Sequence, residues 1–134
     1  MPALQTFIVE DSPVIRDSLI ATLEELVPIE VVGMAEEEAA AVAWLAQHAQ
    51  EVDLAIVDIF LKSGSGLGVV RAAAGQARHV VVLSNYATRE IRQKCLELGA
   101  DRVFDKSTEI EALMLYCEAL ATGHSGDTAA VGLG

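Results

Sequence analysis

The 134-residue sequence predicts an α/β fold in which helices cover both faces of one five-stranded parallel sheet. Short apolar runs alternate five times with amphipathic helical patterns, and parallel strands need such crossover helices. The third run lacks polar alternation, which is typical of a strand buried on both faces. The length and the hydrophobic fraction of 52% fit one compact domain, which we place at residues 1–121, before a flexible Gly-rich tail or linker over 122–134.

The first half of the chain supplies three strands and two helices. We expect strands at residues 7–9, 31–34 and 54–57. Ser12 is a good helix cap, and Pro13 suits the first helical position. The helix that follows has an apolar stripe at Ile15, Leu19, Leu23 and Leu26. Three glutamates at residues 36–38 open a second helix to about His48, because acids in a first turn suit the helix dipole.

The second half supplies two more strands and three helices. We expect helices at residues 67–74 and 89–98, the latter stopped by Gly99, and strands at residues 80–83 and 103–104. Strand alternation turns Phe104 to the face opposite to that of Val103. Ser107 or Thr108 caps a last helix, whose core face holds Ile110, Leu113, Cys117 and Leu120.

Net charge and patterning exclude several function classes. The formal net charge of −11 repels phosphate, so we expect no nucleic-acid binding by this chain. No apolar run reaches about 18 residues, and residues 1–5 lack the basic region of a signal peptide, so we expect no membrane insertion and a cytoplasmic location. Cys95 and Cys117 fall in helical patterns and are expected to be small buried side chains rather than a disulfide.

Polar side chains end four of the predicted strands. Glu10 and Asp11 end the first, Asp58 the third and Ser84 the fourth, and Lys106 follows the fifth. Ligands of such sheets bind outside the carboxyl ends of the strands, so these side chains are expected to converge. Grouped carboxylates repel one another unless a cation is present, and Mg²⁺ prefers such oxygen ligands, with Mn²⁺ as an alternative. Lys106 is expected to pair with Asp58 at rest.

The acidic charge is concentrated in the half of the chain that supplies these carboxylates. Residues 1–60 hold 12 acidic side chains and one basic one, Arg16, whereas residues 61–134 hold 8 of each. The excess belongs either to a solvated acidic face or to a site that needs carboxylates.

Six short motifs together resemble the receiver domain of two-component response regulators, over about residues 5–121. They are Ile8-Val9-Glu10-Asp11-Ser12, Ile56-Val57-Asp58-Ile59, Gly64-Ser65-Gly66-Leu67, Val82-Leu83-Ser84, Leu98-Gly99-Ala100-Asp101 and Asp105-Lys106-Ser107. The resemblance implies a (βα)₅ flavodoxin-like fold and a phosphorylation-activated switch in a phosphorelay. It also implies that the activity is limited to self-phosphorylation and slow autodephosphorylation.

The resemblance assigns roles to the residues at the strand ends. Asp58 accepts a phosphoryl group from a sensor histidine kinase or a histidine phosphotransfer protein. Mg²⁺ is held by Glu10, Asp11, Asp58 and the backbone carbonyl of Phe60. Ser84 and Lys106 bind the phosphoryl group. These assignments fit the chemistry, because phosphoryl transfer needs positioning and charge neutralisation more than covalent help.

The sequence departs from the family pattern at four positions. Val103 stands where receivers usually have an aromatic switch, and Lys62 where they usually have a proline. Asn85 stands where a small residue commonly admits the phosphodonor. Ser107 replaces the proline that usually follows the lysine through a cis bond. A cis bond before a residue other than proline costs about 2.5–4 kcal/mol, so the loop after Lys106 is expected to differ.

Three residues are expected to tune how long the phosphoaspartate lasts: Phe60, Asn85 and Tyr86. Phe60 comes two residues after Asp58, and Tyr86 comes two residues after Ser84. In the family these two positions tune hydrolysis. We hypothesise that the two rings shield the acyl phosphate from water and prolong its lifetime.

The last helix has a second apolar strip at Ala112, Leu115 and Ala119, opposite to its core face. Arg89 and Arg92 add positive charge on the preceding helix. In receivers the surface of the fourth helix, fifth strand and fifth helix often serves output. We therefore expect a downstream protein or a second copy of the chain to bind there.

Three alternatives stay open. A pseudo-receiver would be an interaction module without phosphotransfer, although the sequence retains all five site residues. The chain is alternatively a receiver excised from a DNA-binding transcriptional regulator. An aspartyl-phosphate phosphatase would need a second Asp two residues after the nucleophile, where Phe60 stands.

Overall fold

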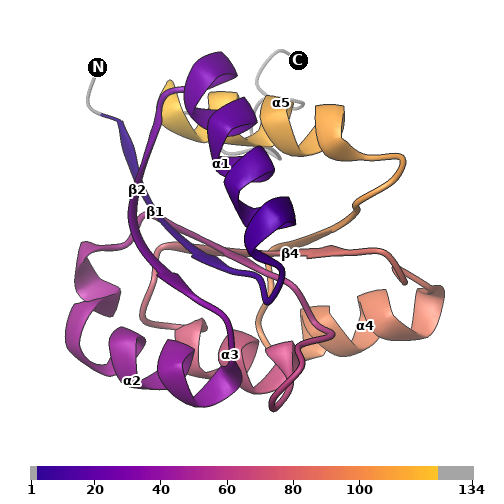
Figure 1. The fold of residues 1–134 in the computed structure, drawn as a ribbon. Coiled ribbons are helices and arrows are strands. Elements are labelled where there is room, and N and C mark those ends of the chain that lie inside the picture. The colour runs from indigo at the N-terminus through magenta and orange to yellow at the C-terminus, as the bar shows by residue number, and fades with distance from the viewer. Residues whose placement is uncertain (1–2, 124–134) are drawn as a thin grey trace.

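The computed structural model describes residues 3–123, over which strands and helices alternate along the chain (Figure 1). The strands are β1 (Leu4–Val9), β2 (Ile29–Ala35), β3 (Leu54–Val57), β4 (His79–Ser84) and β5 (Arg102–Asp105). The helices are α1 (Pro13–Leu26), α2 (Glu38–His48), α3 (Gly66–Ala73), α4 (Arg89–Glu97) and α5 (Ile110–Ala121), with a short 3-10 turn η1 (Ala49–Glu51) after α2.

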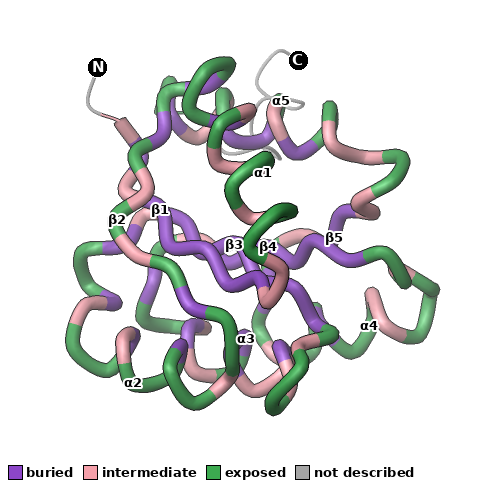
Figure 2. The backbone as a smooth tube through the Cα atoms, viewed as in Figure 1, coloured by how far each residue is buried: buried purple, intermediate pink, exposed green. Residues whose placement is uncertain are grey.

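All neighbouring strands are parallel, in the order β2-β1-β3-β4-β5. This topology confirms the predicted fold class. The central strands are buried and the helices shield them on both sides (Figure 2). Within the described part of the chain, each helix is too short or too polar to cross a bilayer.

Two hydrophobic cores lie on opposite faces of the sheet. Helices α1 and α5 cover one face, and α2, α3 and α4 cover the other (Figure 1). Successive residues of β1 serve the two cores in turn: Phe7 packs on the side of α2, and Ile8 packs on the side of α1. Both side chains are fully buried, and each such burial contributes about 1.5–3 kcal/mol. Val103 and Phe104 likewise point to opposite cores, as strand alternation predicted.

Helix α1 begins as expected but packs through a different stripe. The Ile15 amide donates to the Ser12 hydroxyl over 3.3 Å, and Pro13 occupies the first turn. The predicted stripe is wrong at its ends, since Ile15 is 43% exposed and Leu26 is 57% exposed. The contacting residues are Leu19, Ile20, Leu23 and Val27. Viewed down the helix axis, these four side chains lie within an arc of about a third of a turn. The side chains of Ile15 and Leu26 lie outside this arc, on one side of it.

Two other predicted helix starts are wrong. Helix α2 begins at Glu38, so only this acid of the three lies in the first turn. The reason is that β2 continues to Ala35, which pairs with Val9, and Glu37 is still extended. Helix α5 begins at Ile110 after Glu109, and neither Ser107 nor Thr108 caps it.

The segment before α5 is instead organised by an aspartate. The amides of Ser107 and Thr108 donate to one carboxylate oxygen of Asp105 over 2.7 and 3.1 Å, which is the chemistry of an Asx turn. Gly99 follows α4 with a φ of 113°, in agreement with its expected role as the stop. Both cysteines are buried and free. Apart from residues 122 and 123, the predicted tail lies outside the described residues.

Candidate functional site

The strand register aligns the candidate site residues at one edge of the sheet. Val9 pairs with Val57, and the next residues along those two strands are Glu10 and Asp58. The parallel hydrogen-bond ladder continues into the site, because the Asp58 amide donates to the Val9 carbonyl and the Lys106 amide donates to the Ser84 carbonyl, both over 3.0 Å. The backbones of Asp58 and Lys106 are therefore held by neighbouring strands.

Three carboxylates meet at this edge. Oxygen atoms of Glu10, Asp11 and Asp58 all lie within 4.8 Å of one another. Glu10 and Asp58 are buried, whereas Asp11 is half-buried and faces water. Oxygen ligands of this kind fit a hard divalent ion such as Mg²⁺, which binds through one or two carboxylates and keeps several waters. The three carboxylates that the sequence predicted as metal ligands thus lie together in space.

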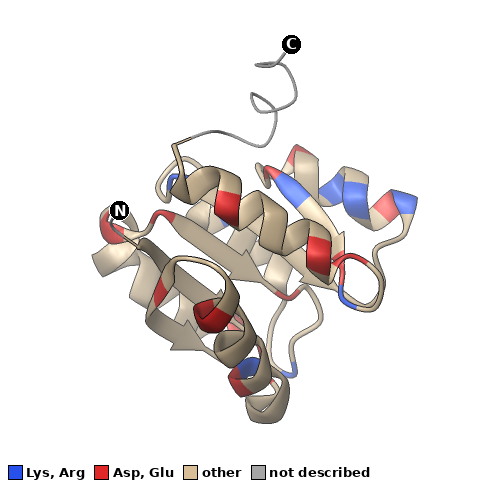
Figure 3. Cartoon of the chain, turned by 90° about the horizontal axis from the view of Figure 1, so that it is seen from above, with Lys and Arg blue, Asp and Glu red and all other residues tan. Residues whose placement is uncertain are grey.

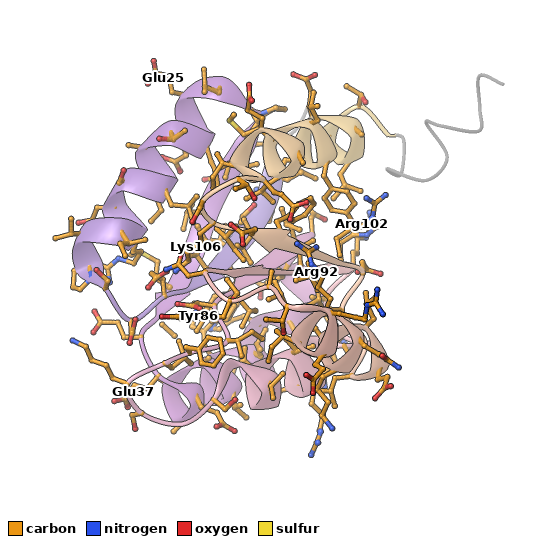
Figure 4. The ribbon with its side chains drawn as sticks, turned by 90° about the vertical axis from the view of Figure 1, so that its right-hand side faces the viewer. Glu25, Glu37, Tyr86, Arg92, Arg102 and Lys106 are labelled. Carbon is orange, nitrogen blue, oxygen red and sulfur yellow. The ribbon has the colours of Figure 1, made fainter. Side chains whose placement is uncertain are left out.

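Lys106 bonds two of these carboxylates. Its ammonium nitrogen lies 2.6 Å from Glu10 Oε1 and 3.1 Å from Asp58 Oδ2. Lys106 is labelled in Figure 4. The contact with Asp58 was expected, but the shorter contact with Glu10 was not. The sequence shows only that both residues end strands, and the positions of the side chains depend on the sheet. One ammonium bonded to two of three clustered carboxylates leaves an excess of negative charge for a metal ion.

The pKa values of this pair reflect burial and charge together. Burial raises the pKa of Glu10 above its ordinary value, and the hydrogen bond from Lys106 only partly opposes this. Burial acts to lower the pKa of Lys106, but the hydrogen bonds and charges of Glu10 and Asp58 outweigh it, so its pKa is raised. Lys106 is therefore fully charged at neutral pH.

The residues after strands β3 and β4 form two similar turns. The Phe60 amide donates to Asp58 Oδ1 over 3.2 Å, and the Tyr86 amide donates to the fully buried Ser84 hydroxyl oxygen over 3.0 Å. Both turns expose the residue two positions after the accepting side chain. As a result the rings of Phe60 and Tyr86 meet edge to face, with centroids 5.2 Å apart. Asn85 is exposed between Ser84 and Tyr86.

Arg92 has a role that sequence patterns did not indicate. Its guanidinium donates to the Ala87 carbonyl over 2.9 Å, to the Val103 carbonyl over 3.0 Å and to the Glu109 carboxylate over 2.7 Å. It therefore joins the β4–α4 loop, β5 and the start of α5. No local signal reveals this, because the three partners come together only in the fold.

The peptide bond between Lys106 and Ser107 is trans.

The predicted surface strip divides between two grooves. Ala112 lines a groove of about 360 Å³ on the α4–β5–α5 side, together with Arg92 and Arg102. Leu115 lies in a groove of about 250 Å³ between α1 and α5, beside Leu26. Arg92 and Arg102 are on the face that Figure 4 presents, and lysine and arginine gather on α4 in Figure 3. Arg89 is exposed on that helix and Ala119 is half-buried on α5.

Comparisons with known proteins agree with this geometry. The family described as "Response regulator receiver domain" matches residues 6–118. Protein-glutamate methylesterase/protein-glutamine glutaminase 5 of Myxococcus xanthus is 31% identical over 116 residues, which are 84% of this chain and 33% of that protein. A cyclic di-GMP phosphodiesterase of Thermotoga maritima is 38% identical over 68 residues, which are 49% of this chain and 18% of that protein. The chain thus spans a third or less of these relatives.

Solved structures share the fold at low sequence identity. The signal receiver domain of the response regulator NarL from Mycobacterium tuberculosis is 21% identical, with a TM-score of 0.74 over 87% of this chain and 98% of that one. The response regulator domain of Thermotoga maritima CheB is 20% identical, with a TM-score of 0.72 over 90% and 92%. Because the family match spans most of the described residues, this chain belongs to the response regulator receiver domain family.

Proposed function

We propose that this receiver is a switch of a two-component phosphorelay in which Asp58 accepts a phosphoryl group in a Mg²⁺-dependent reaction. The observation that supports it best is Lys106 bonding Asp58 and Glu10 beside a cluster of three carboxylates. In the proposed step a carboxylate oxygen of Asp58 bonds to phosphorus as the phosphorus–nitrogen bond of a phosphohistidine breaks. The imidazole leaves with the electron pair and takes up a proton.

The residues around Asp58 supply positioning and charge. Glu10, Asp11, Asp58 and the Phe60 carbonyl would hold Mg²⁺, which when bound neutralises charge on the phosphoryl oxygens. The Lys106 ammonium lies beside Asp58 and would bond a phosphoryl oxygen. Ser84 ends the neighbouring strand β4, and its hydroxyl would donate to a second phosphoryl oxygen.

The phosphodonor is proposed to dock beside α1. A groove of about 360 Å³ lies between α1 and the start of α5, and its lining includes Ile15, Leu19, Leu83, Lys106 and Ile110. At its rim Val14 is 78% exposed. An apolar groove that reaches the phosphate-binding lysine suits a helix of a histidine kinase or phosphotransfer protein. The acidic charge of the first half favours a basic partner surface.

Read-out is proposed to occur at the α4–β5–α5 face, toward a downstream protein or a second copy of the chain. A phosphoryl group adds a charge of about −1.5 to −2 and three acceptor oxygens. The Ser84 hydroxyl, which now accepts from the Tyr86 amide, would turn toward these oxygens. Movement of that loop would reach the output face because Arg92 holds the Ala87 carbonyl. In this proposal Arg92 connects the loop after Ser84 to the output face, which is the role of the aromatic switch residue in other receivers.

Phosphorylation by a small donor tests the proposal. The protein is incubated with acetyl phosphate and Mg²⁺, and the intact mass is measured with and without a chelator. We expect one phosphoryl adduct that needs Mg²⁺, is absent from Asp58→Asn and is retained by Asp17→Asn, an exposed acid on α1. An adduct that persists in Asp58→Asn would refute the assignment. No adduct with any donor, a cognate kinase included, would favour a pseudo-receiver.

The read-out face has a matched pair of variants. Ala112→Glu places a charge in the groove on the α4–β5–α5 side, whereas Leu115→Glu places one in the groove between α1 and α5. The sequence placed Leu115 in the same predicted interface as Ala112, but the two line different grooves, and we now propose the groove of Ala112 as the output surface. We therefore expect Ala112→Glu, but not Leu115→Glu, to reduce association of the phosphorylated protein in light scattering or partner capture. The reverse pattern would move the output surface to α1 and α5.

A further inference from the structure

The loop between β3 and α3 contains Asp58 and Phe60 and has little rigidity of its own. Lys62, Ser63 and Gly64 are exposed, and Gly64 has a φ of 81°. No proline restrains the loop, since Lys62 stands at the position where the family has one. A loop with this composition loses much conformational entropy on ordering, so contacts from outside must hold it.

Glu38, the first residue of α2, makes such contacts. The Ser65 amide donates to Glu38 Oε1 over 2.8 Å, and the Glu38 amide donates to the Ser63 carbonyl over 3.2 Å. The side chain also fills the space above two glycines. A Cβ at Gly64 would lie 2.4 Å from the Glu38 Cβ, and a Cβ at Gly68 would lie 2.0 Å from Glu38 Oε2. The half-buried Glu38 side chain thus contacts both the loop and the first turn of α3.

The same contacts reach the backbone of the phosphoacceptor. Ser65 caps α3 by accepting from the Leu67 amide over 3.0 Å, and the Gly66 amide donates to the Ile59 carbonyl over 2.8 Å. A Cβ at Gly66 would lie 2.0 Å from the Asp58 carbonyl oxygen, so the start of α3 rests directly on the phosphoacceptor backbone. Ser65 is therefore connected to the backbone of Asp58 and Ile59 through the first residue of α3.

We propose that Glu38 is a positioning residue for the metal and phosphoacceptor site, holding the β3–α3 loop so that Asp58 and the Phe60 carbonyl are in place before Mg²⁺ binds. This inference rests on the proposed function, in which those two groups bind the metal. Ordering the loop in advance removes an entropy cost from metal binding. Residues that hold metal ligands in place commonly affect metal affinity about 10–100-fold.

Substitutions at Glu38 separate the hydrogen bond from the charge. Glu38→Ala removes both, whereas Glu38→Gln keeps an oxygen that accepts from the Ser65 amide. Glu37→Ala is the matched control, because it removes the neighbouring acid, labelled in Figure 4, whose side chain makes no capping hydrogen bond. Three quantities are measured: amide hydrogen exchange of Ser65 without metal, the Kd for Mg²⁺ by calorimetry, and the rate of phosphorylation by acetyl phosphate.

For Glu38→Ala we expect faster exchange at Ser65, about tenfold weaker Mg²⁺ binding and slower phosphorylation. Glu38→Gln and Glu37→Ala should stay near the wild type. Gly68→Ala gives a second perturbation, because its new Cβ displaces the Glu38 carboxylate without removing it. Gly68→Ala should weaken Mg²⁺ binding in the wild-type chain but not in Glu38→Ala, where the carboxylate is already gone.

Several outcomes would overturn the inference. Faster exchange at Ser65 with unchanged Mg²⁺ affinity would make the contact merely structural. Equal loss in Glu38→Ala and Glu38→Gln would assign the effect to charge. If Glu38→Ala fails to fold, as judged by circular dichroism, the single variant Gly68→Ala decides, and an unchanged Mg²⁺ affinity in it would overturn the inference. If the wild type takes up no phosphoryl group but Glu38→Ala still weakens Mg²⁺ binding, the proposed function fails and the positioning role stands.

Discussion

Lys106→Met keeps most of the apolar length of the side chain but removes the ammonium that bonds both Glu10 and Asp58. The Lys106 side chain is only 12% exposed, and its partners are 3% and 9% exposed. The substitution therefore leaves two nearly buried carboxylates without their cation and next to a third. It tests the electrostatic reasoning about the site independently of any phosphodonor.

The structure sets the expected magnitude of this change. Removing one partner of a buried ion pair costs about 3–5 kcal/mol. We take the lower end, about 3 kcal/mol, because Asp11 at the edge of the cluster is half-buried and admits water. For a domain of this size that is a fall in Tm of about 10 °C. Because the pKa of Lys106 is raised above 10.5, its stabilisation is complete at neutral pH and is lost only as pH rises through the raised value.

Urea unfolding at pH 7, with a chelator or with Mg²⁺, measures the effect. Adding Asp58→Asn to Lys106→Met should recover about 1–2 kcal/mol by removing one of the repelling charges. Mg²⁺ should stabilise Lys106→Met more than the wild type, because the ammonium no longer competes for the carboxylates. Lys62→Met, at an exposed lysine of the β3–α3 loop, is the control. A loss below about 1 kcal/mol, with the same response to Mg²⁺ as the wild type, would refute the reasoning.

Three further predictions concern lifetime, pH and thiol chemistry. Phe60→Asn and Tyr86→Ala should each speed hydrolysis of the phosphoaspartate, because the two rings contact each other above the turns of the site; an unchanged or slower loss of phosphate, followed by intact mass, would exclude shielding. The hydrogen bond from Arg92 lowers the pKa of Glu109 below its ordinary 4.5, so the wild type should lose more stability than Glu109→Gln between pH 7 and about pH 3, and parallel pH profiles of unfolding would contradict this. Burial raises the pKa of Cys117 to about 12 and also raises that of Cys95, so a thiol reagent at pH 8 should label both only after unfolding, and rapid labelling of the native chain would show that the core opens.

Much of the fold could be predicted because its signals are local. The apolar run from Leu54 to Val57 and the Ser12-Pro13 start are each visible within a few residues, and the structure has both. Predictions of which face of a helix is buried were less exact. Ile15 and Leu26 are apolar and spaced by helical steps, yet the sheet contacts Ile20 and Val27 instead. The spacing of apolar residues in the sequence does not determine which side of a helix packs against the sheet.

By itself the sequence determined the order of strands and helices and the type of residue that ends each strand. Those properties depend on short-range periodicity, capping and charge. The tertiary structure decided which side chains bond. Lys106 meets Glu10 across 96 positions, Glu38 meets Ser65 across 27 and Arg92 meets Glu109 across 17. Such contacts depend on strand register and helix docking, which arise from the packing of the whole chain rather than from any local pattern.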